Sequence, residues 1–385
     1  MQQLNQSISA PYSSVALQPK PYWSLVPEYT AQIAIMIAWP HANTLWKNKL
    51  EEARITFADI IAAISLASTP WVLIPSEYSI HEVESYVNSS LMKNNRALKF
   101  PIEYSICDYD DTWIRDYGPL TTSKIDSYGK MQLCLKNFIF NGWGQKYKFD
   151  LDNNVNSSLW NSGEFHLHYL SKIHDIQSQP ISLNKTPCIL EGGSIDSNGD
   201  ILITTKNCLL NSNRNAHLSQ KEIEDILHSE LGINHIIWLN HGHLDGDDTD
   251  SHVDTLARFI NQDTIVFQGC NEETDSHFFS LQAMKIELIS AAQEFNLQLI
   301  ELPFPKPCFD ETGRRLPATY ANFLIVNSHL LLPTYNCDAD TIAQETLQKH
   351  FPDLKIIPVP CLTLIKNNGS LHCSTMQLPQ IWNSL

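Results

Sequence analysis

The chain has 385 residues, of which 43% are hydrophobic and 18% are charged, a composition typical of a globular protein with a large core. Its 42 acidic and 26 basic residues give a formal net charge of −16. That balance argues against a nucleic-acid-binding protein, which needs a basic face for phosphates, and it favours the approach of small cations.

Apolar segments typical of strands recur along the chain, and segments with helical spacing of apolar residues alternate with them. The expected strands are residues 33–40, 71–75, 133–140, 201–205, 235–240, 264–269, 297–304, 322–333 and 354–360. The expected helices are residues 47–68, 220–231, 276–295 and 339–350, and the polar stretch 151–162 is expected to be a surface loop. This alternation predicts the α/β class, in units of about 70–80 residues.

The cysteines and the N-terminal residues bear on the compartment. Nine cysteines are scattered without a CxxC pair, whereas disulfide frameworks and zinc ribbons show closely spaced pairs. The first residues do not have the pattern of a signal peptide, and no uncharged apolar run is long enough to cross a membrane. We therefore expect a cytoplasmic protein with a flexible arm over residues 1–20 and a single domain over residues 21–385.

The segment GDDTDSHVDTLARF, residues 246–259, carries the strongest chemical signal. If it enters a strand, His252 and Asp254 point to the same face, where an imidazole could move protons while a carboxylate holds a cation. A calcium loop that starts at Asp245 would need glutamate at its twelfth position, which is Leu256 here. A solvent-exposed acidic turn remains the alternative interpretation.

Three further polar motifs adjoin apolar segments: DDTWIRDYGP (110–119), LEGGSID (190–196) and GSLHCSTMQLP (369–379). Charged groups that enter a core need partners or a function. Asp116 precedes a Gly-Pro turn, and Glu191 precedes two glycines that let the backbone approach a ligand closely. Cys373 follows a loop rich in asparagine and glycine, which favours an accessible thiol. Simpler interpretations are a surface Arg115–Asp116 pair, a turn carboxylate and an inert buried cysteine.

Together and in this order, the four motifs resemble the agmatine deiminase family, a peptidyl-arginine deiminase-like branch of the guanidine-modifying (pentein) superfamily. The resemblance runs from PEYTAQIAIMIAWPH near residue 27 to the Cys373 motif, and it includes CLLNSNRN (208–215) and residues 313–336. It implies a pentein-type five-bladed α/β propeller, in which pseudo-fivefold ββαβ-like units surround a central active site. Three departures bear on substrate details more than on chemistry: Tyr29 in the family's E-W motif, the glycine-poor KNNGSLHC loop, and Ser251 before the histidine.

The resemblance also implies a role for each motif residue. Asp116 of W-x-R-D-x-G-P and Asp254 of H-V-D grip the guanidinium. His252 of H-V-D shuttles protons, and Glu191 of E-G-G steadies that histidine. Cys373 of H-C-x-T is the nucleophile. Paired carboxylates suit this task because they match the planar fork of a guanidinium.

The implied reaction is hydrolysis of agmatine to N-carbamoylputrescine and ammonia, a step of putrescine synthesis, through a covalent cysteine thiouronium and without a cofactor or metal. For the distal ammonium, Trp113 would form an apolar wall, and one of three acids, Asp247, Asp248 or Asp250, would form the cap; Asp248 is our choice. The expected partner is a small cationic guanidine, with neither nucleic acid nor membrane, and homo-oligomerisation is left open.

Two alternatives stay open. The first is deimination of free or peptidyl arginine, for which Arg315 or Arg258 could hold the carboxylate of free arginine. The second is a non-catalytic protein that binds a guanidine or a polyamine. Such a protein would keep Asp116 and Asp254 but lose the thiol or the imidazole, and both Cys373 and His252 are present here.

Overall fold

The computed structural model describes residues 20–129, 131–172 and 182–380. The expected N-terminal arm therefore lies outside the described residues, apart from Lys20. Lys20 is held in place, because its ammonium group lies 3.1 Å from a carboxylate oxygen of Asp200.

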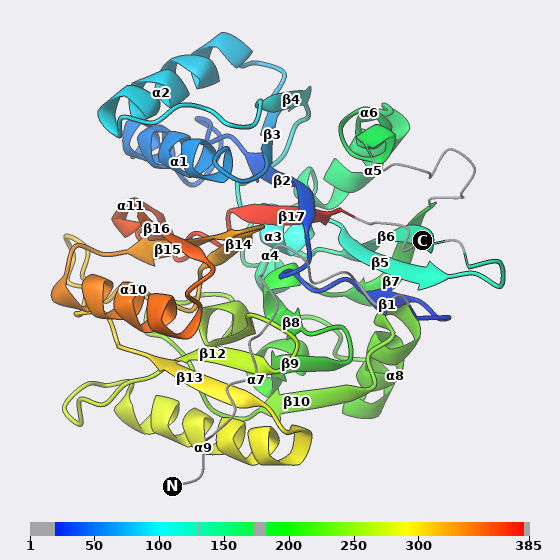
Figure 1. Ribbon diagram of the computed structural model, residues 1–385, viewed down its shortest axis with the longest axis vertical. Helices are drawn as coiled ribbons and strands as arrows, with labels where there is room; N and C mark the ends of the chain where they lie inside the picture. Colours follow the sequence, from blue (N-terminus) through cyan, green and yellow to red (C-terminus); the bar gives the residue numbers. More distant parts are fainter. Residues whose placement is uncertain (1–19, 130, 173–181, 381–385) are drawn as a thin grey trace, which may run out of the picture.

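The described strands form five sheets, and three of these have three strands each (Figure 1). The first contains β8 (Ile195–Ser197), β9 (Ile201–Thr205) and β10 (His235–Leu239). The second contains β11 (Ala257–Phe259), β12 (Thr264–Gln268) and β13 (Gln298–Leu302). The third contains β14 (Leu324–Val326), β15 (His329–Thr334) and β16 (Lys355–Pro360).

The other two sheets have four strands each. One has the order β1 (Ser24–Leu25), β5 (Leu120–Ile125), β6 (Met131–Ile139) and β7 (Ser182–Ile189). The other has the order β17 (Thr375–Pro379), β2 (Gln32–Ala38), β3 (Thr69–Ile74) and β4 (Glu103–Ile106). The fold is therefore mixed α/β.

Each sheet contains the same pattern, an antiparallel strand pair followed by a parallel pair. In the β11-β12-β13 sheet, β12 is antiparallel to β11 and parallel to β13, and α9 (Phe278–Phe295) connects the two parallel strands. Parallel neighbours need such a crossover, because a tight hairpin can join only antiparallel strands. The sheet of β17 and β2 is distinctive, because its antiparallel partner comes from the far end of the chain, with Thr375 opposite Ile37.

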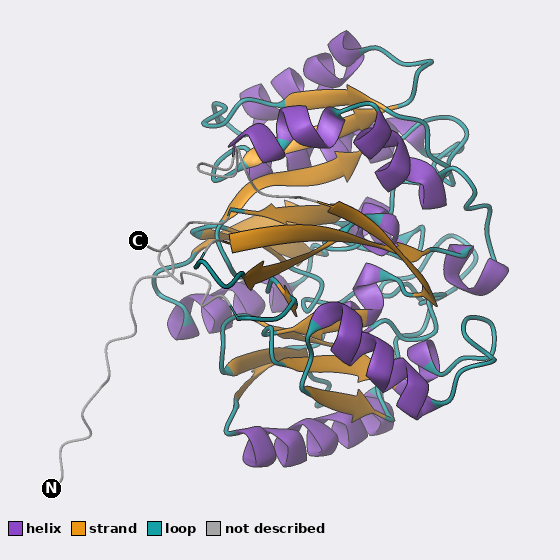
Figure 2. Ribbon diagram, turned by 90° about the vertical axis from the view of Figure 1, so that its right-hand side faces the viewer, coloured by secondary structure: helices purple, strands orange, loops and turns teal. Residues whose placement is uncertain are grey.

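The longer helices lie around the outside of the sheets in Figure 1, and the sheets lie one above another in the side view of Figure 2. These helices are α1 (Leu50–Ile64), α2 (Ile80–Lys93), α5 (Val155–Asn161), α6 (Glu164–His168), α8 (Gln220–Leu231), α9 and α10 (Asp338–His350). Shorter helices are α3 (Ile114–Tyr117), α4 (Gly142–Gln145), α7 (Lys206–Leu209) and α11 (Leu362–Ile365). The 3-10 turns are η2 (Asp152–Asn154), η3 (Leu170–Lys172), η4 (Gly192–Ser194) and η5 (Val253–Thr255).

The alternation of strands and helices expected from the sequence is confirmed, with two corrections. Residues 322–333 form two strands, because Asn327 turns the chain with a φ of 51°. Residues 151–162 form η2 and α5 and are not a surface loop. Val155 and Leu159, one helical turn apart, are both buried, and an apolar face of one turn is too short to give a clear periodic signal. Within the described ranges, every helix is too short or too polar to span a bilayer.

Candidate active site

The predicted site residues come together at the ends of short elements. Asp116 lies in α3, Glu191 directly precedes η4, His252 directly precedes η5, and Asp254 lies within η5. A side-chain carbon added at Gly193 would lie 2.7 Å from Nδ1 of His252, 2.8 Å from Oδ1 of Asp116 and 3.1 Å from Oδ2 of Asp254. Three side chains from two separate motifs therefore surround one point.

The segment around His252 is not a strand, so the expected same-face geometry is wrong. Asp250 and Ser251 have φ values of 66° and 70°, which a strand cannot contain. The carboxylate of Asp247 accepts hydrogen bonds from the backbone nitrogens of Thr249 and Ser251, at 3.1 and 2.8 Å. This tight turn, followed by η5, is what brings His252 and Asp254 to the same place.

Asp116 is buried, so the interpretation as a surface pair with Arg115 is wrong. Its Oδ2 accepts a hydrogen bond from Nε1 of Trp143 at 2.8 Å, and its Oδ1 accepts one from the backbone nitrogen of Gly193 at 2.9 Å. Burial raises the pKa of Asp116 to about 6, although the charge of His252 opposes the shift. Two donors thus fix this carboxylate at the base of the site.

Glu191 is fully buried beside His252 and is not an exposed turn carboxylate. Its Oε2 lies 3.7 Å from Nε2 of His252 and accepts a hydrogen bond from Nε of Arg214 at 2.7 Å. Burial alone would raise the pKa of Glu191, but His252 and Arg214 outweigh it and leave that pKa below its ordinary value. Burial lowers the pKa of His252, yet Asp116 and other neighbours raise it well above the ordinary value. The imidazole is therefore held as a cation between two carboxylates.

Asp254 is oriented by a histidine that the motif analysis did not assign to the site. Nδ1 of His372 lies 2.8 Å from Oδ2 of Asp254, and Nε2 of His372 lies 2.6 Å from Oε2 of Glu28. Each ring nitrogen of His372 therefore faces a carboxylate oxygen. Burial alone would raise the pKa of Asp254, but His372, His252 and Arg258 together lower it. Oδ1 of Asp254 has no hydrogen-bond partner among the described residues, so it can accept one from a ligand.

The Cys373 thiol lies against these acids. Its sulfur is 3.7 Å from Oδ2 of Asp254, and Nδ2 of Asn322 donates a hydrogen bond to it at 3.3 Å. Burial, followed by the charges of Asp254 and Asp116, raises the pKa of the Cys373 thiol well above its ordinary value. The thiol is therefore protonated in this state. A cation placed between the two carboxylates would remove the electrostatic part of that effect.

A small hollow, with a cavity volume of about 20 Å³, lies against the Cys373 side chain. Its lining includes Asp116, Cys373 and three aromatic residues, Trp113, Trp143 and Tyr147. The lining also includes Asp248, whose Oδ2 accepts hydrogen bonds from the Tyr147 hydroxyl at 2.5 Å and from Nδ2 of Asn368 at 2.7 Å. The hollow is therefore an aromatic pocket with a carboxylate on its wall and a thiol beneath it.

The other acids and the candidate arginines of this region are engaged elsewhere. Asp250 pairs with Arg214 at 2.7 Å, so the acidic turn is not simply solvated. Arg258 pairs with Glu28 at 2.8 Å and Arg315 pairs with Asp275 at 2.6 Å. Among the described residues, no lysine or arginine lines the pocket. The pocket consequently suits a ligand that is cationic at both ends.

Comparison with known families agrees with this geometry. A family model described as Porphyromonas-type peptidyl-arginine deiminase matches residues 24–379. The chain belongs to this family.

Relatives with assigned names show which members of the Porphyromonas-type peptidyl-arginine deiminase family this chain is similar to. A Marinomonas sp. (strain MWYL1) protein named "Putative agmatine deiminase" is 30% identical over 373 residues, 92% of this chain and 93% of the relative. The agmatine deiminase of C. jejuni, solved as a Cys-to-Ser variant with substrate bound, is 36% identical, with a TM-score of 0.77 over 92% of this chain and 96% of that one. A P. gingivalis "Putative Arginine Deiminase" is 34% identical, with a TM-score of 0.79 over 93% and 98% of the two chains. The resemblance to agmatine deiminases drawn from the four motifs is confirmed.

Several residues of the site in this deiminase-family chain were not identified from the sequence. Arg214 lies in the CLLNSNRN segment, which indicated the family but gave no role to its arginine. Trp143, Asn322 and His372 contact the predicted residues from separate elements. A polar residue within an apolar segment, such as Asn322 between Ala321 and Phe323, was the available signal for one of them.

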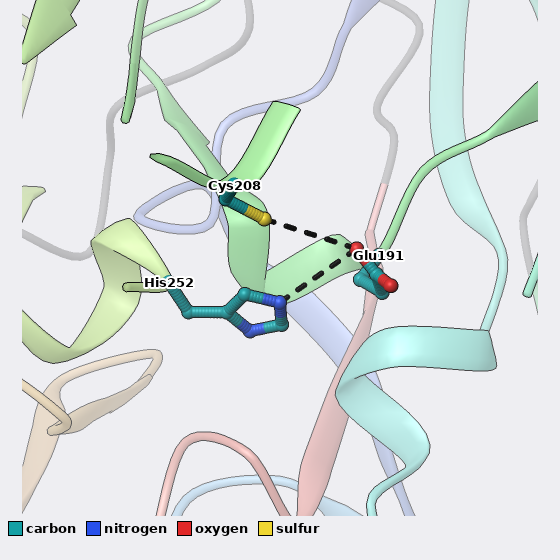
Figure 3. Close-up of side chains that lie close together, drawn as sticks. All are labelled: Glu191, Cys208 and His252. Atoms are coloured by element: carbon teal, nitrogen blue, oxygen red, sulfur yellow. Dashed lines mark hydrogen bonds and ion pairs between the residues drawn. The ribbon is translucent and has the colours of Figure 1, made fainter. Parts of the chain in front are cut away.

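One group within the described residues has the spacing to hold a metal ion. Its members are Glu191, Cys208 and His252, all buried, with one possible ligand atom each, and these atoms lie within 4.8 Å of one another. Figure 3 shows the Cys208 sulfur and a ring nitrogen of His252 directed at the same oxygen of Glu191.

Proposed function

We propose that this protein is an agmatine deiminase, a hydrolase that converts agmatine and water to N-carbamoylputrescine and ammonia. The observation that carries the proposal is the convergence of Cys373, His252, Asp116 and Asp254 below a pocket lined by Asp248 and, among the described residues, by no lysine or arginine. The named relatives support the same activity.

In the first half-reaction, Asp116 and Asp254 bind the N–H groups of the guanidinium, and each charge-assisted contact contributes about 1.5–3 kcal/mol in a shielded site. The bound cation lowers the pKa of the Cys373 thiol, which releases its proton to solvent, and the thiolate attacks the central carbon to form a C–S bond. His252 donates its proton to the departing nitrogen, so that the C–N bond breaks and ammonia leaves.

The second half-reaction regenerates the enzyme. His252, now neutral, takes a proton from water, and the resulting hydroxide attacks the carbon of the thiouronium. The C–S bond breaks with the sulfur departing as a thiolate, the hydroxyl group of the intermediate gives up its proton to that thiolate, and the neutral ureido product leaves. Glu191, held by Arg214, stabilises the imidazolium form of His252 at both stages.

For the distal ammonium we propose Asp248 as the acidic cap and Trp113 as the apolar wall. Both line the pocket, whereas the carboxylates of Asp247 and Asp250 are bound within the turn and to Arg214. Trp113 is held in place because Gly369 packs closely on its ring, where an added side-chain carbon would approach to 2.5 Å.

A second candidate substrate is arginine, which the named P. gingivalis relative favours. Free arginine would bring a carboxylate near Asp248, and the cations considered for it, Arg258 and Arg315, are paired with other carboxylates. Two like charges in one shielded pocket repel, so agmatine fits better.

We further propose that the five sheets are the blades of a pentein-type propeller around this site. The shared strand pattern and the pairing of β17 with β2 support that arrangement. A single catalytic domain over residues 21–385 and a cytoplasmic location belong to the same proposal.

The test is product analysis with agmatine, free arginine and a peptidyl arginine as substrates. We expect N-carbamoylputrescine and ammonia from agmatine at a higher kcat/KM than either alternative gives. Cys373→Ser should bind agmatine without turnover, whereas Cys134→Ser, a buried cysteine in β6 with no contact to the site, should remain active. Arginine turnover equal to or above agmatine turnover would reject the substrate, and residual activity within tenfold in Cys373→Ser would reject the nucleophile.

A further inference from the structure

Cys208 is a second buried thiol beside the proton shuttle, and the proposed reaction does not use it. It lies in α7, and its sulfur is 3.9 Å from Oε2 of Glu191. The same oxygen is 3.7 Å from Nε2 of His252 (Figure 3). A thiol, an imidazole and a carboxylate therefore face one small volume.

The imidazole of His252 is poorly satisfied for a buried group. The side chain is 1% exposed, and neither Nδ1 nor Nε2 has a hydrogen-bond partner among the described residues. Its carboxylate neighbours, Asp116 and Glu191, lie at 3.6 and 3.7 Å, beyond hydrogen-bonding distance. Buried polar atoms without partners are uncommon, and Nε2 points into the space between Glu191 and Cys208.

The dimensions of this group suit a tetrahedral metal ion. Ligand atoms around tetrahedral zinc lie roughly 3.3–3.7 Å apart, given metal–ligand distances of about 2.0–2.3 Å. The separations here, 3.7 Å and 3.9 Å with none above 4.8 Å, need only small side-chain movements to reach those values. One sulfur, one imidazole nitrogen and one oxygen favour Zn²⁺ over Mg²⁺ or Ca²⁺, which take oxygen ligands.

Arg214 contacts one member of this group. Its Nε donates to both carboxylate oxygens of Glu191, at 3.0 and 2.7 Å. When Zn²⁺ binds, the Cys208 thiol and the His252 imidazolium each lose one proton, so two positive charges leave as two arrive. The total charge beside Arg214 is unchanged, and Glu191 can keep one oxygen on the arginine.

We infer that Glu191, Cys208 and His252 form an inhibitory site for a borderline-soft divalent cation of the Zn²⁺ type. The ion occupies Nε2 of His252 and the carboxylate that steadies it, so the imidazole can no longer transfer protons. Inhibition as a consequence rests on the proposed function, whereas binding of the metal does not.

Binding is measured with Co²⁺ alone on the full-length Cys373→Ser protein, because the Cys373 thiol also lies beside carboxylates. We expect near-ultraviolet thiolate-to-cobalt absorption that saturates at one equivalent and disappears when Zn²⁺ is added. Adding Cys208→Ser should remove the absorption. The matched control instead adds Cys308→Ser to the Cys373→Ser protein. Cys308 is partly exposed and lies outside the site, so this control should keep the cobalt absorption.

Absorption that survives Cys208→Ser, or its absence from the Cys373→Ser protein, would overturn the inference. X-ray absorption of Zn²⁺ bound to the Cys373→Ser protein decides the matter even if Cys208→Ser does not fold. One sulfur with nitrogen and oxygen neighbours supports the site, and two or more sulfurs reject it. In the unmodified protein, Zn²⁺ should lower agmatine turnover at least tenfold and a chelator should restore it; full activity with bound zinc would reject the inhibitory role.

Discussion

Replacing His372 with glutamine tests how the site keeps its buried carboxylates charged. The imidazole of His372 bridges Glu28 and Asp254, at 2.6 and 2.8 Å, and the side chain is 2% exposed. Glu28 would keep its ion pair with Arg258 at 2.8 Å, but Asp254 would lose its closest charged partner. Removing one partner of a buried ion pair leaves an uncompensated charge and costs about 3–5 kcal/mol.

The chain provides a matched control at its surface. Nδ1 of His241 lies 2.8 Å from a carboxylate oxygen of Glu287, the same separation as in the His372–Asp254 pair, but the His241 side chain is 55% exposed. Because solvent screens this pair, His241→Gln should cost at most about 1 kcal/mol.

The assay is equilibrium unfolding in urea at pH 7, with the midpoint and the slope compared for the unmodified protein and the two variants. His372→Gln should lower the midpoint markedly and His241→Gln should barely move it. Equal, small losses in both variants would show that His372 is not a charged bridge, and the explanation for the lowered pKa of Asp254 would then fail.

Three further predictions concern activity. Gly193→Ala would place a methyl group 2.7 Å from Nδ1 of His252 and 2.8 Å from Oδ1 of Asp116. Agmatine turnover should therefore fall at least about 100-fold, while circular dichroism shows a folded protein. Near-normal turnover would refute the convergence of these groups. Since the pKa of Asp116 is raised to about 6, the carboxylate gains a proton as the pH falls through that value. The kcat/KM for agmatine should fall over the same pH range. A pH profile whose acidic limb lies near pH 4 would contradict the role of Asp116 in binding the guanidinium. Asp248→Asn should lower kcat/KM for agmatine by roughly 10- to 150-fold and leave butylguanidine, which lacks the ammonium, unaffected; equal losses for both would remove Asp248 from the ammonium site.

The elements that were predictable from the sequence are those with local signals. α8 begins at Gln220 and ends at Leu231, as expected, because a capping box at Ser219 and Glu222 starts it and Gly232 in the left-handed conformation ends it. β9 has the expected bounds because it is a short, fully buried run rich in β-branched residues. By contrast, β8 and β11 have three residues each, too few to show alternation.

The site shows the same division between local and long-range information. The motifs named five residues of the candidate site, Asp116, Glu191, His252, Asp254 and Cys373, since each motif is a short local pattern. The partners of those residues were not predictable, because they depend on contacts between distant segments. His372, for example, meets Glu28 across 344 positions of the chain, and no local pattern encodes that meeting.

The position of β17 has a consequence for how the site forms during folding. Cys373 lies two residues before β17, a strand that finds its neighbour in β2, more than 300 positions earlier in the chain. A polypeptide without β17 keeps Asp116 and Asp254 but lacks the strand pairing that holds Cys373 beside them. Placement of the Cys373 sulfur therefore depends on pairing between distant segments, which costs more loop-closure entropy than the pairing of strands that are neighbours in the chain.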